Sequence, residues 1–104
     1  MPFNNQQSVD ISSSGDNTVV AALAGQSIYV RRLFLSAASE VTVQFKSGST
    51  ALSGPTTILS MLLDDSSGRA SDPWLITRSG EALVINLGSA VQVGGTIWFD
   101  YGPG

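Results

Sequence analysis

The chain has 104 residues, of which 42% are hydrophobic and only 12% are charged, and its net charge is −3. A chain of this length forms one domain, and five Lys and Arg residues are too few for the basic patch that nucleic acids or anionic membranes require. Cys and His are both absent, which excludes disulfides, thiol nucleophiles, His-based triads and imidazole general bases. We therefore expect no enzymatic activity, no metal site and no cofactor.

The first eight residues form a polar segment. Residues 1–8 read MPFNNQQS, and Phe3 is their apolar anchor. This composition predicts an N-terminal arm, followed by one domain over residues 9–104. An uncharged arm can lie across a neighbouring subunit and pair with the open edge of a sheet. The candidate interface residues of the arm are Phe3, Asn4, Asn5, Gln6 and Gln7.

The same segment bears on where the protein is made. It lacks the positive charge and the apolar stretch of a secretory signal. No part of the chain approaches the ~20 consecutive apolar residues that cross a bilayer. We therefore expect synthesis in a cytoplasm and no membrane partner.

Apolar and polar residues alternate along most of the remaining chain, which is typical of half-buried antiparallel strands. The clearest case is the segment 40–46, which alternates over its whole length. Turn signals rich in Gly, Ser and Pro separate such segments at roughly 8–12-residue spacing, as in a β-sandwich or barrel. The predicted strands cover residues 9–12, 17–23, 27–36, 40–46, 56–63, 82–87 and 96–101, and a further strand begins near Trp74.

These elements predict an all-β fold, namely an antiparallel, jelly-roll-like β-sandwich of seven to eight short strands. The pair Gly94-Gly95 interrupts the last strand and predicts a β-bulge or a bend. Residues 64–72 are polar and predict an exposed loop, and their spacing matches no calcium-binding loop. The predicted core residues are Val41, Val43, Phe45, Leu83, Ile85, Leu87, Ile97 and Phe99.

Arg31 and Arg32 lie within a predicted strand that is apolar on both faces. Because adjacent strand residues face opposite ways, one of the two should face the more buried side and need an acidic partner. Two interpretations stay open: an internal ion pair with Glu40 or Glu81, or a salt bridge across a subunit contact. Trp98 falls on the polar face of its strand, so it is either covered by a neighbouring element or part of a contact surface.

Two functional alternatives follow from other side chains. A glycosidase needs two carboxylates across a cleft, but a sandwich of this length leaves little chain for cleft walls, and we expect no catalytic residue. Aromatic rings stack on sugars as well as on proteins, so a small carbohydrate-binding module is an alternative from a different class. The aromatic residues concerned are Trp74, Trp98, Tyr29 and Tyr101.

Three stretches resemble a group of small proteins of tailed bacteriophages and prophages. They are IYVRRLFL at 28–35, VTVQFKSGSTALSGP at 41–55 and PWLITRSGEALVINLGSAVQVGGTIWFDY at 73–101. In that group a V-T-F-K-S-G strand and turn precedes a G-E-A-L-x-I-x-L hairpin and a terminal V-x-V-x-G-x-I-x-Y strand. The resemblance implies a β-sandwich virion component without catalytic residues, and the nearest role is that of a capsid decoration, or cement, protein.

The resemblance also implies partners and a location. It implies binding to the major capsid protein, self-association as a homotrimer, and a place on the capsid exterior of the virion after synthesis in the host bacterial cytoplasm. A tail, head-fibre or head–tail connector component is the alternative within the same class. The candidate contact residues outside the arm are Arg31, Arg32 and Trp98.

Overall fold

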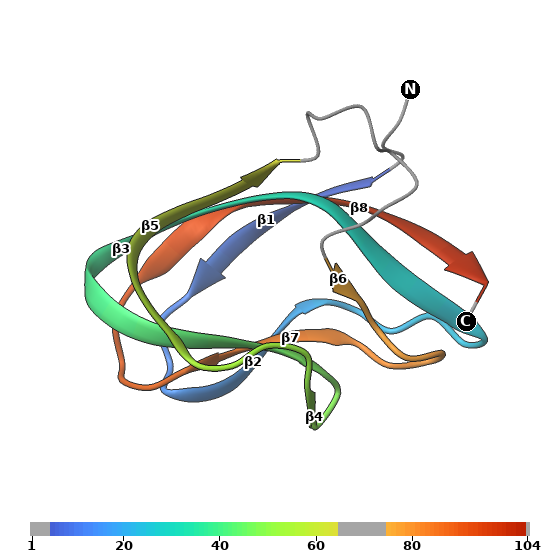
Figure 1. Ribbon diagram of the computed structural model, residues 1–104, viewed down its shortest axis with the longest axis horizontal. Coiled ribbons are helices and arrows are strands. Elements are labelled where there is room, and N and C mark those ends of the chain that lie inside the picture. The colour runs from blue at the N-terminus through green and yellow to red at the C-terminus, as the bar shows by residue number, and fades with distance from the viewer. Residues whose placement is uncertain (1–4, 65–74, 104) are drawn as a thin grey trace.

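The structure, a computed structural model, describes residues 5–64 and 75–103, and these residues form eight β-strands and no helix (Figure 1). The bounds of the strands are β1 Asn5–Ile11, β2 Gly15–Val20, β3 Gln26–Ser47, β4 Thr50–Ala51, β5 Thr56–Asp64, β6 Leu75–Ile76, β7 Leu83–Leu87 and β8 Val93–Pro103. Every pairing between them is antiparallel. The predicted all-β antiparallel fold is therefore confirmed.

A single curled sheet runs in the order β1-β8-β3-β7-β2, and β4, β5 and β6 also pair with β3. β3 is 22 residues long. Along one edge it pairs first with β8 and then with β7, while β5 follows its other edge. Figure 1 shows β3 crossing one layer, turning at the end of the molecule and returning in the second layer. The sheet thus folds over on itself, and its two halves face each other.

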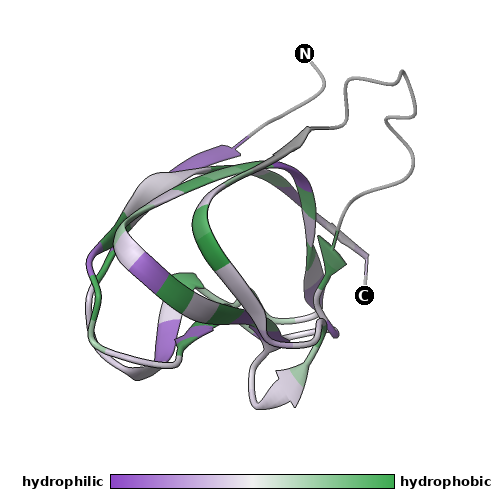
Figure 2. Ribbon diagram, turned by 60° about the vertical axis from the view of Figure 1, so that its left-hand side comes forward, coloured by the Kyte–Doolittle hydropathy of each residue, from purple (hydrophilic) through white to green (hydrophobic). Residues whose placement is uncertain are grey.

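The core lies between these two halves and consists of the side chains that point inward along each strand. Figure 2 shows the alternation of apolar and polar residues along the ribbons. Burial of this apolar surface is the main force that closes the two halves on each other. All eight predicted core residues are buried, none exceeding 5% exposure: Val41, Val43, Phe45, Leu83, Ile85, Leu87, Ile97 and Phe99.

The structure corrects the predicted division of the central segment. Two strands were expected at 27–36 and 40–46, but one continuous strand, β3, covers both. The register with β5 shifts between Ser36 and Val41, which marks the bend. The intervening residues are small or polar and mostly exposed. The strand can therefore bend at these residues and continue as part of the same sheet. Residues 56–63, which were predicted to form a strand, lie in strand β5.

The predicted arm over residues 1–8 also differs from the structure. Asn5–Ser8 belong to β1, which pairs with β8 in an unbroken register from Asn5 to Ile11. Main-chain hydrogen bonding does not require apolar side chains, and an edge strand can keep polar ones in solvent. Phe3 and Asn4 lie outside the described residues, as do Trp74 and residues 65–72 of the predicted loop.

The Gly94-Gly95 pair contains no β-bulge. β8 keeps its register on both sides through these residues, towards Val9 and Asp10 of β1 and towards β3. Gly95 is required for a different reason. It has φ +155°, and a Cβ at this position would overlap the carbonyl oxygen of Phe34 in β3. Glycine thus allows the close approach of two main chains.

We expect Gly95→Ala to destabilise the fold by about 3 kcal/mol, because the added methyl group would push β8 away from the central strand. Gly94→Ala is the matched control, since a Cβ there meets only the carbonyl oxygen of Val9 at 3.6 Å, an ordinary contact distance. Urea unfolding followed by circular dichroism measures both. Equal stability of the two variants would contradict the close approach.

Candidate functional site

A register shift within β3 determines where the two adjacent arginines point. Val30 pairs with Phe99 and Arg32 pairs with Trp98, so Arg31 is the additional residue of a β-bulge. Val30 and Leu33 on either side are fully buried, and both arginines are half-buried on the outer face. The expectation that one arginine faces the more buried side is therefore wrong, because it assumed strict alternation.

Arg31 is held by a neighbouring strand. Its Nε lies 3.3 Å from Oδ2 of Asp100 in β8, and both side chains are largely shielded from solvent, with 15% and 17% exposure. The guanidinium also lies 5.8 Å from the ring centroid of Tyr29. Among the residues that the structure describes, the acidic partner of Arg31 is thus Asp100, and neither Glu40 nor Glu81 pairs with it. The carboxylate of Glu81 instead accepts a 2.6 Å hydrogen bond from the hydroxyl of Ser47.

Arg32 lies over the ring of Trp98, with its Cζ 4.8 Å from the ring centroid. A guanidinium at this distance from an indole makes a cation–π contact. Gln6 of β1 is opposite Trp98 in the sheet register, so its side chain points to the same face. One row across the sheet thus contains Gln6 of β1, Trp98 of β8 and Arg32 of β3. The neighbouring strand β3 thus places Arg32 over the ring of Trp98, and the Trp98 side chain stays partly exposed.

A solvent-facing aromatic residue completes this surface. Phe34 lies two positions beyond Arg32 on the same face of β3 and is 43% exposed, whereas Leu33 and Leu35 are fully buried. We call this surface the aromatic–arginine face. It consists of Tyr29, Arg31, Arg32, Phe34, Trp98 and Asp100.

The structure brings together five of the residues singled out from the sequence, namely Gln6, Tyr29, Arg31, Arg32 and Trp98. The remaining described arm residues, Asn5 and Gln7, lie on β1. Sequence reasoning missed Phe34 as a surface residue and Asp100 as the partner of Arg31. Strict alternation from Leu35 could have placed Phe34 outside, whereas the Asp100 contact depends on the pairing of β3 with β8.

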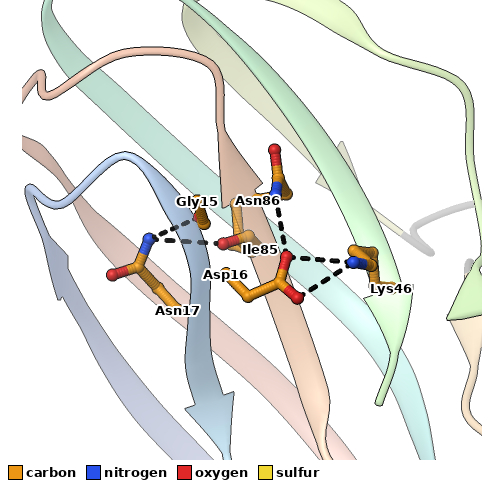
Figure 3. Close-up of polar contacts among 6 residues, drawn as sticks. All are labelled: Gly15, Asp16, Asn17, Lys46, Ile85 and Asn86. Atoms are coloured by element: carbon orange, nitrogen blue, oxygen red, sulfur yellow. Dashed lines mark hydrogen bonds and ion pairs between the residues drawn. The ribbon is translucent and has the colours of Figure 1, made fainter. Parts of the chain in front are cut away.

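A second polar cluster ties β2, β3 and β7 together in the other layer (Figure 3). Lys46 Nζ donates to both carboxylate oxygens of Asp16, at 3.0 and 2.9 Å, and Asn86 Nδ2 donates to Oδ1 at 2.7 Å. Beside this cluster, the side-chain amide of Asn17 donates separately to the Gly15 carbonyl at 3.1 Å. The Asn86 hydrogen bond, and then the contact with Lys46, hold the pKa of Asp16 below its ordinary value of 3.8.

These two clusters consist of charged, hydrogen-bonding and aromatic side chains. Among residues 5–64 and 75–103, no three His, Cys, Asp or Glu side chains come close enough together to hold a metal ion. The described part of the chain also has no helix of the length and apolarity needed to span a membrane. The aromatic–arginine face offers guanidinium donors and ring faces, which are groups that recognise another surface.

The free energy of unfolding of Asp16→Asn should be lower than that of the native protein at neutral pH. The folded state depresses the pKa of this carboxyl, so its contribution is present above the ordinary pKa and lost as the pH falls through the depressed one. The difference should therefore disappear in acid. Urea unfolding at a series of pH values measures it, and a difference that persists unchanged in acid would contradict the assignment.

A double-mutant cycle of Arg32→Ala and Trp98→Leu should give a coupling energy of about 0.5–1 kcal/mol. The cycle separates the cation–π contact from the other interactions of each side chain. Urea unfolding of the native protein, both single variants and the double variant supplies the four free energies. Additive effects would show that the stacking contributes nothing to stability.

Comparison of the chain with models of protein families, with curated proteins and with solved structures found no match. The resemblance to small virion proteins of tailed phages therefore stays a prediction from the sequence.

Proposed function

We propose that the protein is a structural component of a tailed-phage virion, a capsid decoration protein that binds the major capsid protein on the outside of the shell. Its contact surface is the aromatic–arginine face. The role involves no catalysis, because the protein acts by adding contacts between itself and the assembled shell. The sequence resemblance suggests this role, and the composition of the face supports it.

The observation that carries the proposal is the concentration of interface-type residues on one face. Tyr, Trp and Arg are the residue types that contribute most to binding energy at protein interfaces. Here Arg31 and Arg32 are two of only five basic residues in the chain, and both lie beside aromatic rings. Phe34 remains 43% exposed next to them. An exposed aromatic residue on the same face as two ordered arginines has the composition of a binding hot spot.

Stabilisation of the shell would follow from mass action. A protein that binds only the assembled shell stabilises it by RT ln(1 + [L]/Kd) at each site, or about 3 kcal/mol at a hundredfold excess over Kd. A shell offers many equivalent sites, so a modest contribution at each one adds up against internal pressure. No single contact needs to be strong.

The same face disfavours the carbohydrate-binding alternative. A sugar-binding tryptophan needs a free ring face, whereas the guanidinium of Arg32 lies 4.8 Å from the ring centroid of Trp98. A tail, head-fibre or connector component would use the face equally well, and it differs from a decoration protein in the number of copies. The homotrimer that the resemblance implies stays a prediction.

Phe34→Ser should weaken binding to assembled capsids by about tenfold or more, as expected when an aromatic residue is removed from the centre of an interface. The fold should be kept, because this side chain is exposed. Leu23→Ser is the matched control: Leu23 is also exposed, at 48%, but lies in the segment between β2 and β3 and is not a residue of the face.

The measurements are co-sedimentation with purified capsids and the temperature at which capsids release DNA with and without the protein. Hundreds of bound copies and a raised release temperature are expected. Equal release temperatures with a few copies at the tail or portal would reject decoration and favour a tail or connector role. Equal binding by both variants would reject the face.

A further inference from the structure

β1 is an edge strand without the features that usually protect an edge. Within residues 5–64 and 75–103, its only strand partner is β8. It has seven residues, contains neither Lys nor Pro, and keeps an unbroken register. Natural edges are commonly protected by bulges, by lysine or proline, or by being very short. The opposite end of the sheet follows that rule, because β2 has a register shift between Thr18 and Val20.

The orientation of the main chain shows which groups the open edge presents. The carbonyl of Val9 faces β8, since a Cβ on Gly94 would lie 3.6 Å from it. Successive residues of a strand direct their N–H and C=O groups to opposite edges, so those of Ser8 point away from β8. In agreement, the carbonyl of Ser8 accepts a 3.4 Å hydrogen bond from the side-chain amide of Gln7 at an exposed position. Ser8 thus stands at the centre of the open edge.

We propose that β1 pairs with β1 of a second copy of this chain, antiparallel and with the two-fold axis at Ser8. In this register all seven residues are paired, and Ser8 lies opposite Ser8 of the other copy. Residues that point inward in one copy lie opposite residues that point inward in the other. A shift of the register by one residue would destroy this match between the faces. Three hydrogen-bonded residue pairs, with two bonds each, give about six new main-chain hydrogen bonds.

Charge selects the same register. Asp10 is the only charged residue of β1, and a two-fold axis at Asp10 would place two like charges directly opposite each other, which is destabilising. With the axis at Ser8, Asp10 lies opposite Gln6, whose amide can donate to a carboxylate oxygen. The carboxylate of Asp10 already accepts from Gln92 within the chain, and it has acceptor sites for both amides.

This pairing would also strengthen binding to the shell, a consequence that rests on the proposed function. A two-fold axis perpendicular to the joined sheet leaves the outer faces of both copies on the same side. The two aromatic–arginine faces would then form one bivalent surface. Two linked contacts bind more tightly than either alone when the target presents matching sites, as the repeated surface of a shell does.

The first test is the molar mass of the purified protein by size exclusion with light scattering over a range of concentrations. A mass approaching twice 10.8 kDa is expected. Ser8→Pro removes both central N–H donors, and should weaken the dimer by about tenfold or more. Ser8→Ala keeps these donors and should dimerise like the native protein. Circular dichroism verifies that both variants fold.

The second test uses the absence of cysteine from the chain. Ser8→Cys places one thiol opposite its counterpart at the two-fold axis, so mild oxidation should give a disulfide-linked dimer. Thr96→Cys is the matched control, since Thr96 is the neighbour of Ser8 on the same face but lies one strand further from the axis. A mixture of Gln6→Cys and Asp10→Cys chains should cross-link more than either variant alone.

Different outcomes overturn different parts of the argument. A monomer at every concentration, or cross-linking of Thr96→Cys as fast as Ser8→Cys, would reject the edge contact. A trimer that Ser8→Pro leaves intact would also reject it and would support the threefold assembly. A dimer that fails to bind capsids would leave the edge contact standing and reject the proposed function instead.

Discussion

The continuous strand β3 is the constraint on which the rest of the structure depends. Five of the seven other described strands pair with it, and it contributes residues to both layers of the folded sheet. Since neighbouring strands exchange main-chain hydrogen bonds along its whole length, β3 fixes the position of β8 in one layer and of β7 in the other. The two layers therefore cannot slide independently, and the core between them has one register.

A local irregularity in this strand creates the most distinctive surface of the molecule. Without the bulge at Arg31, one of the two arginines would point between Val30 and Leu33 into the apolar core, where a charge is costly to bury. The additional residue restores the inward position to Leu33 and leaves both arginines outside. There they contact side chains of β8 and Tyr29. The bulge at Arg31 thus both keeps charge out of the core and determines the composition of the outer face.

The proposed contact face and the proposed pairing edge lie in one half of the molecule. The aromatic–arginine face is built by β3 and β8, and β1 continues the same layer to an open edge. The other layer carries the Asp16–Lys46–Asn86 cluster, which joins three of its strands to each other. The layer that contains β2 and β7 thus has polar contacts between its own strands. The layer that contains β1 and β8 directs arginine and aromatic side chains outward. This division is compatible with the surface-binding role proposed above.

The sequence by itself determined the fold class, the core and most strand positions, because alternation with a period of two is a local property that the side chains carry directly. It also marked Gln6 as part of a polar segment, Tyr29 and Trp98 as aromatic candidates, and Arg31 and Arg32 as charges within an apolar strand, because these residue types are visible without a structure. Only the tertiary structure decided that two predicted strands are one, that residues 5–8 belong to the sheet, and that Gly95 is required by the main chain at Phe34. It also decided that Arg31 contacts Asp100 across 69 positions of the chain. These features depend on which strands become neighbours, and that choice arises from the burial of the whole core rather than from any local pattern.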